Sequence, residues 1–189
     1  MVIKMLNVIY NNKHLNNLDK SRPIVLALSG GVDSMVLFDL LLKANFNVII
    51  AHVNHHKRVE SITEEQYIRQ IAKETNCIIE VLDYIHEKDN FQAEAHNSRY
   101  EFFSNVCRKY NAGALITAHH YIDNLETIIM NIVRGSNIYG YAGIKECIQY
   151  EDFSVIRPLI KVDKKELYAY AKLNNITILK ILLMKVMII

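Results

Sequence analysis

The stretch SGGVDS, residues 29–34, carries the residue types of an anion-binding loop. It follows an apolar run and leads into apolar residues at helical spacing. Gly30 and Gly31 allow close backbone approach and φ values that a side chain disfavours. The N–H groups at the start of the next helix favour an anion at the same place, and Ser29 and Ser34 add hydroxyl groups. These features predict a phosphate-binding loop.

Asp33 distinguishes this loop from the Walker loop, because the G-x-x-x-x-G-K-[ST] spacing and its lysine are both absent. A carboxylate repels a polyphosphate unless a divalent cation lies between them. Mg²⁺ takes one or two carboxylates together with substrate phosphates. An acid at a helix start is also favoured by about 0.3–1 kcal/mol without any ligand. The loop alone leaves both interpretations open.

A second polar cluster, AHVNHHKR at residues 51–58, follows another apolar run. His52, Asn54 and His55 stand in or after a predicted strand, where apolar residues are expected. A polar loop with incidental histidines explains them equally well. A zinc site is disfavoured, because no cysteine or carboxylate follows at ligand spacing.

The third cluster is TAHHYIDNLET, residues 117–127. Asp123 and Glu126 fall on the first turns of a predicted helix and share a face at i, i+3. His119 and His120 suit a core, capping or functional role on their own. What decides between these interpretations is where the fold places this cluster relative to the glycine loop.

Periodicity predicts alternating strands and helices. The strands are expected at 23–29, 47–54, 77–84, 112–120 and 153–160, and the helices at 33–46, 61–76, 91–111, 123–135 and 163–175. The expected helix boundaries are a capping box of Ser61 and Glu64, a stop at Gly135 and an N-cap at Asp163.

This alternation predicts an α/β fold, a doubly wound parallel five-stranded sheet of order 3-2-1-4-5. Ligands of such sheets bind beyond the carboxyl ends of the strands, where the strand order reverses. That rule brings Asp33 and Asp123 toward one crevice. The sequence therefore predicts a nucleotide site with two acids.

Composition sets wider limits. The 189 residues are 51% hydrophobic and 22% charged, which suits one globular domain. A net charge of +2 does not by itself indicate a nucleic-acid partner. Three scattered cysteines favour a reducing compartment, and no signal peptide or membrane-length apolar run is evident. We expect a cytoplasmic protein without a membrane partner, and the sequence leaves a homodimer open.

The loop resembles the PP-loop of ATP pyrophosphatases, enzymes of the adenine nucleotide alpha hydrolase-like type that cut ATP between its α and β phosphates. Over about residues 22–175 the chain is similar to bacterial tRNA(Ile)-lysidine synthetases. The similarity runs through AHVNHHKR, AEAHNSRYEFF (93–103), ITAHHYIDNLETIIMNIVRGS (116–136), GYAGI (140–144) and IRPLI (156–160). It implies an ATP- and Mg²⁺-dependent ligation of free L-lysine to C2 of the wobble cytidine in tRNA(Ile) with a CAU anticodon, through an adenylated cytidine.

The resemblance also assigns roles to residues. ATP phosphates would be bound by Ser29, Gly30, Gly31, Val32, Asp33 and Ser34, with Asp33 beside Mg²⁺. The adenine would lie along Ala51, His52 and Val53. Asp123 and Glu126 would hold the incoming lysine, and Asp123 would also face the metal. His120 and Arg99 would contact the adenylated intermediate, and Arg134 and Gly135 would lie beside the tRNA.

The chain departs from this family's pattern in two places. Ile122 stands where the family has the first of two acids, and Asn124 replaces a glutamine. After 163–175 the family continues with polar and arginine-rich sequence, whereas residues 178–189 here are almost all apolar. We therefore expect a PP-loop catalytic domain at 1–176 and interpret 177–189 as an aberrant tail from a truncation or frameshift.

Two alternatives to lysidine synthesis stay open at this stage. A PP-loop tRNA thiolation enzyme would use the same loop but generally needs cysteines, and none of the three lies beside the loop motifs. A nucleotide-binding remnant without activity is compatible with the altered tail and the acid lost at Ile122.

Overall fold

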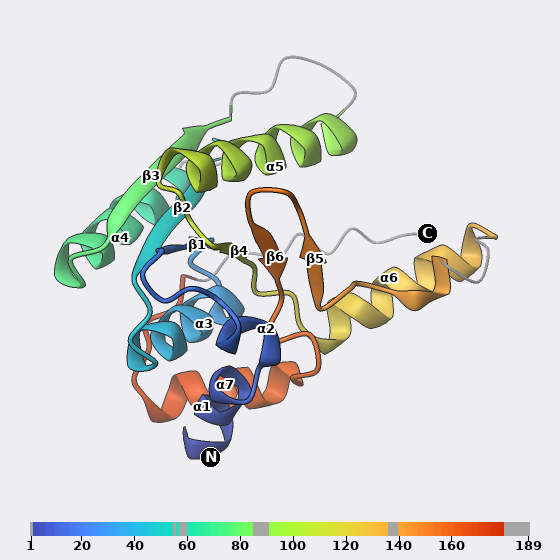
Figure 1. The fold of residues 1–189 in the computed structure, drawn as a ribbon, viewed down its shortest axis with the longest axis horizontal. Helices are drawn as coiled ribbons and strands as arrows, with labels where there is room; N and C mark the ends of the chain where they lie inside the picture. The colour runs from blue at the N-terminus through green and yellow to red at the C-terminus, as the bar shows by residue number, and fades with distance from the viewer. Residues whose placement is uncertain (1, 55, 57–59, 85–90, 136–139, 180–189) are drawn as a thin grey trace.

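The structure, a computed structural model, describes residues 2–54, 56, 60–84, 91–135 and 140–179. One sheet crosses the molecule, with helices on both of its faces (Figure 1). Its strands are β1 (Ile24–Ala27), β2 (Val48–Asn54), β3 (Ile78–Asp83), β4 (Ala114–Ile116), β5 (Cys147–Gln149) and β6 (Ser154–Ile156). They lie in the order β3-β2-β1-β4-β6-β5.

The predicted order of the five parallel strands is confirmed, with β6 as the fifth of them. The strand order reverses at β1, which pairs in parallel with β2 on one side and β4 on the other. The sixth strand, β5, was missed. It is a three-residue edge strand that pairs antiparallel with β6, and three residues are too few to show a period of two in sequence.

Seven α-helices and a short 3₁₀ helix are present in the described residues. They are α1 (Val2–Tyr10), α2 (Lys13–Asn16), α3 (Val32–Lys43), α4 (Glu60–Glu74), α5 (Phe91–Lys109), α6 (Tyr121–Val133), η1 (Gly140–Ala142) and α7 (Lys164–Leu173). α1 and α2 were not predicted. Met5 and Ile9 of α1 are buried, one turn apart on the face that packs on α3.

Two of the three predicted helix boundaries are confirmed. Asp163 caps α7 by accepting a hydrogen bond from the Lys165 N–H at 2.8 Å. Gly135, with φ +69°, follows the end of α6. The predicted cap at Ser61 is wrong, because α4 already includes Glu60.

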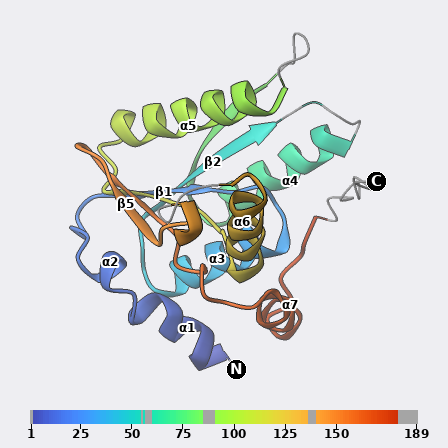
Figure 2. The same ribbon diagram turned by 90° about the vertical axis from the view of Figure 1, so that its right-hand side faces the viewer.

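The strand residues alternate between two cores, as expected for a sheet covered on both faces. Ile24 and Leu26 of β1 face a large cluster formed with α1, α3, α4 and α7. Val25 faces a smaller cluster under α5, which includes Phe103 and Val106. Figure 2 shows α5 alone above the sheet and α1, α3 and α7 below it. α6 extends outward from the sheet (Figure 1), and none of its residues is buried.

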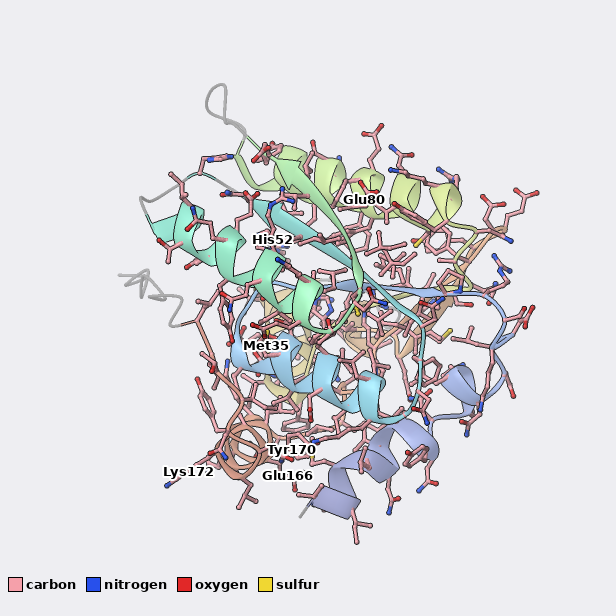
Figure 3. The ribbon with its side chains drawn as sticks, turned by 90° about the vertical axis from the view of Figure 1, so that its left-hand side faces the viewer. Met35, His52, Glu80, Glu166, Tyr170 and Lys172 are labelled. Atoms are coloured by element: carbon pink, nitrogen blue, oxygen red, sulfur yellow. The ribbon has the colours of Figure 1, made fainter. Side chains whose placement is uncertain are left out.

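α7 is fixed to α3 by a buried tyrosine. Tyr170 is fully buried, and its hydroxyl donates to Asp39 at 2.7 Å and accepts from Lys43 at 3.1 Å. Figure 3 shows Tyr170 pointing inward beneath α3, whereas Lys172 on the same helix points to solvent. The second half of α7 is therefore held against the second half of α3. No helix of the described residues is long and apolar enough to cross a membrane.

Replacing Leu167 by alanine should lower the free energy of unfolding by about 2–5 kcal/mol, because the side chain is fully buried and its loss leaves a cavity. Leu173→Ala is the matched control on the same helix. Its side chain is 58% exposed, so its cost should stay near 0.5 kcal/mol. Urea unfolding measures both. Equal costs for the two variants would contradict the docking of α7 on the core.

Candidate active site

The glycine loop lies between β1 and α3, at the strand-order reversal where a ligand site was predicted. Gly30 has φ +81°, a conformation that favours glycine. Ser34 braces the loop: its hydroxyl donates to the Gly31 carbonyl at 3.0 Å and lies 3.1 Å from the Ser29 hydroxyl. Gly31 is the N-cap of α3 and has no capping side chain. Ser29 and Ser34, with their hydroxyls, are part of the cavity lining.

Asp33 is the most unusual group in the loop. Its Oδ1 is buried and makes no hydrogen bond within the described residues. Its Oδ2 lies 3.7 Å from His120 Nε2 and 3.7 Å from Lys164 Nζ. Burial raises the pKa of Asp33 above its ordinary value, Lys164 and His120 oppose the rise, and nearby Asp123 adds to it. A buried carboxylate oxygen without a partner is costly, and it is a suitable ligand for a hard cation.

His120 joins the two acids. As N-cap of α6 it accepts a hydrogen bond at Nδ1 from the Ile122 N–H at 3.2 Å, and its backbone N–H donates to Asp123 Oδ2 at 2.8 Å. Its side chain is buried, with Nε2 directed at Asp33. The sequence left His120 between a capping and a functional role, and the structure gives it a capping role beside Asp33. Asp33 and Asp123 are brought to one crevice, as predicted.

A cavity of about 370 Å³ opens beside the loop. Of the predicted site residues it is lined by Ser29, Asp33, Ser34, Ala51, His52, Val53, Arg99 and Asp123. His52, labelled in Figure 3, is buried, and its Nδ1 lies 2.8 Å from the Leu28 carbonyl, so it ties β2 to the start of the loop. The second polar cluster therefore contributes a wall of the cavity.

Other predicted site residues lie outside this lining. Gly30, Gly31 and Val32 belong to the loop behind it, and Glu126 is exposed on α6. Arg134 and Gly135 follow the far end of α6, a helix of 13 residues and so roughly 20 Å long. The structure thus separates them from the cavity by the length of that helix. The side chain of Ile122, which stands in place of an acid, is 37% exposed.

The cavity also contains residues to which the sequence assigned no role in the site. These are Ala27, Leu28, Ser61, Glu64, Tyr100, Phe103, Thr117, Ala118 and His119. His119 lines it, and His120 does not. The His119 Nδ1 lies 2.9 Å from the Thr117 hydroxyl. Burial lowers the pKa of His119, and the nearby Arg157 lowers it further. Its position just beyond the carboxyl end of β4 was the available signal.

The first residues of the expected tail pack on the loop. The Leu179 N–H donates to the Gly30 carbonyl at 3.1 Å, and the Tyr67 hydroxyl of α4 donates to the Thr177 carbonyl at 3.1 Å. A Cβ on Gly30 would lie 2.5 Å from Leu179 Cδ1. Residues 177–179 therefore bridge α4 and the loop. The remainder of the expected tail, 180–189, lies outside the described residues, so the predicted boundary at 176 stays a prediction.

The three cysteines are separate from the cavity lining. Cys107 is buried in the core under α5, and burial raises the pKa of its thiol to about 12. Cys77 and Cys147 are partly buried outside the cavity. In the described part of the chain, no three histidine, cysteine or acidic side chains gather into a metal site by themselves. A cation at Asp33 would depend on substrate phosphates for its remaining ligands, which is how Mg²⁺ is usually bound.

Residues 4–180 match the PP-loop domain. The chain belongs to this family. It is 40% identical over 160 residues to the tRNA(Ile)-lysidine synthase of Enterococcus faecalis, covering 79% of this chain and 34% of that protein. It is 38% identical over 168 residues to the tRNA(Ile)-lysidine synthase of Streptococcus pyogenes, covering 87% of this chain and 38% of that one. The chain thus spans little more than a third of the length of these relatives.

Solved structures show the same PP-loop fold at low identity. The U34-tRNA thiolase NcsA from Methanococcus maripaludis superposes with a TM-score of 0.78 at 17% identity, covering 95% of this chain and 65% of that one. The NH3-dependent NAD synthetase of Campylobacter jejuni gives a TM-score of 0.57 at 17% identity, covering 92% of this chain and 72% of that one. This likeness concerns the fold alone.

Asp33→Asn should stabilise the protein at pH 7 in buffer with a chelator. Because the folded protein raises the pKa of Asp33 above 3.8, the ionised carboxylate costs stability at neutral pH, and this cost fades as the pH falls toward 4. Each kcal/mol gained would raise Tm by about 2–4 °C in a protein of this size.

Asp39→Asn is the control on the same helix. Asp39 accepts hydrogen bonds from Lys43 and Tyr170, so its replacement should lower Tm at pH 7. Differential scanning calorimetry between pH 4 and pH 8 measures both variants. A lower Tm for Asp33→Asn at pH 7 would contradict the account of Asp33 as a costly buried charge.

Proposed function

We propose that this chain ligates lysine to C2 of the wobble cytidine in tRNA(Ile) with a CAU anticodon, using ATP and giving lysidine. The observation that carries the proposal is the pair of carboxylates, Asp33 and Asp123, held through His120 at the edge of one cavity. One acid belongs to the phosphate loop, and the other lies where a cationic substrate can approach. The names of the tRNA(Ile)-lysidine synthase relatives support tRNA(Ile) as the substrate and lysidine as the product.

In this proposal ATP lies across the carboxyl edge of β1 and β2. Its adenine follows the backbone of 51–53, and its phosphates lie against the loop, where N–H groups and the Ser29 and Ser34 hydroxyls can bind them. Asp33 fits a Mg²⁺ ligand because its Oδ1 is buried and unpartnered. Mg²⁺ bound there would offset the negative charge of the phosphates.

The first step joins the cytidine O2 to the α-phosphorus and breaks the bond to the bridging oxygen, so that pyrophosphate leaves. Arg99 lines the cavity, where its guanidinium would stabilise charge developing on the α-phosphate. In the second step the uncharged lysine amine attacks C2, AMP leaves with the O2 oxygen, and the nitrogen gives up a proton to solvent. Asp123 and Glu126 would hold the lysine before this step, since carboxylates bind ammonium groups well.

Nucleoside mass spectrometry on tRNA(Ile) with a CAU anticodon tests this proposal. After incubation with the chain, ATP, Mg²⁺ and lysine, the wobble cytidine should gain the mass of lysine minus water, and omission of ATP or lysine should abolish the gain. Asp123→Asn should lower the yield at limiting lysine, and Asp152→Asn, a surface control that keeps the fold, should not.

The other outcomes also have clear meanings. An exchange of oxygen for sulfur, when a sulfur donor replaces lysine, would support the thiolation alternative instead. ATP binding without any modified nucleoside would contradict activity of this chain and support the nucleotide-binding alternative.

A further inference from the structure

The loop at 29–34 contains no cation, although it would face a triphosphate carrying several negative charges. Around Asp33, Lys164 Nζ and His120 Nε2 each lie 3.7 Å from Oδ2. His120 is already engaged at Nδ1, which accepts a hydrogen bond from the Ile122 backbone N–H. Lys164 is the lysine that the structure places beside the loop acid.

The position of Lys164 is not explained by the stability of its helix. Lys164 is the first residue of α7 after the Asp163 cap, at the end where the helix dipole is positive. A cation there is unfavourable, whereas an acid would be favoured. Its neighbour Lys165 has the same disadvantage but is exposed. Something other than helix formation is needed to account for a lysine at 164.

Lys164 is also held less tightly than other paired lysines of this protein. Lys43 and Lys109 lie 2.8 Å and 2.6 Å from their carboxylate partners, which is hydrogen-bond distance. The 3.7 Å between Lys164 and Asp33 exceeds that distance. The Lys164 side chain is 35% exposed, so its ammonium has room to turn toward a ligand.

Three helix starts converge at this point. α3 carries Asp33 in its first turn, α6 begins at the His120 cap, and α7 begins at Lys164. The Tyr121 N–H of α6 donates to the Val162 carbonyl just before α7, at 3.1 Å. The Tyr170 contacts fix the other half of α7 to α3. Lys164 is thus held by the fold near the phosphate loop.

We propose that Lys164 supplies the phosphate-binding cation that the loop lacks, by contacting the β- and γ-phosphates of ATP. These two phosphates form the pyrophosphate that leaves in the adenylation step. Lys164 thereby balances negative charge on the leaving pyrophosphate, while Asp33 would bind the Mg²⁺ ion. This inference rests on the proposed function for its nucleotide, but its test needs neither tRNA nor lysine.

The experiment compares the binding of two ligands, AMP and a non-cleavable ATP analogue. The analogue has a methylene bridge between its α and β phosphates. Isothermal titration calorimetry in Mg²⁺ buffer measures both ligands on the unaltered chain and on Lys164→Gln, Lys164→Arg and Lys165→Gln. Lys164→Gln should weaken the ATP analogue roughly 10- to 100-fold, as expected for losing a hydrogen bond to a charged group. AMP lacks the two outer phosphates, so its Kd for Lys164→Gln should stay within about twofold of its Kd for the unaltered chain.

The remaining variants separate this role from a structural one. Lys164→Arg should retain most of the affinity for the analogue because it keeps the charge. Lys165→Gln, which removes the same charge one residue away, should leave both ligands unaffected. The proposed role of Lys164 would be wrong if Lys164→Gln weakened the binding of the analogue and of AMP equally, or if the variants at 164 and 165 had equal effects. Neither result would contradict nucleotide binding at this site. Failure of the unaltered chain to bind the analogue would overturn this inference and the proposed use of ATP together.

Discussion

The site depends on the partial burial of the Asp33 carboxylate at the start of α3, a burial that the surrounding residues offset only in part. Its Oδ1 has no hydrogen-bond partner in the described residues, and its Oδ2 faces His120 and Lys164 beyond hydrogen-bond distance. Such a group opposes folding when no ligand is bound. A ligand that brings a cation to this oxygen would remove that cost, and this is the physical argument for the proposed Mg²⁺ beside ATP.

The parallel sheet makes this arrangement possible. Because the strand order reverses at β1, the segments that follow β1 and β4 both enter the same crevice. The loop after β1 brings Asp33, and the loop after β4 brings His120 and Asp123. α7 returns along α3 and adds Lys164 from a third direction. The core under α3 and α7 therefore sets the distances within the site.

The sequence was sufficient to predict the strand order, the loop and the meeting of Asp33 with Asp123, because these depend on periodicity and on the rules of parallel sheets. It could not tell which of His119 and His120 caps α6 and which lines the cavity. That depends on α6 starting at Tyr121, two residues before the predicted start. It could not find Lys164 either, because that residue reaches the site only through the packing of α7 on α3. β5 was missed because its pairing with β6 defines it, and its three residues show no pattern.

The most direct test of the central claim is which bond of ATP is cut. Phosphorus NMR can follow ATP incubated with the chain, Mg²⁺, lysine and tRNA(Ile) with a CAU anticodon. A site that binds the outer two phosphates as a leaving group should release AMP and pyrophosphate in equal amounts, dependent on the tRNA. Release of ADP and inorganic phosphate would contradict the account, because it would mean that the loop serves transfer of the terminal phosphate.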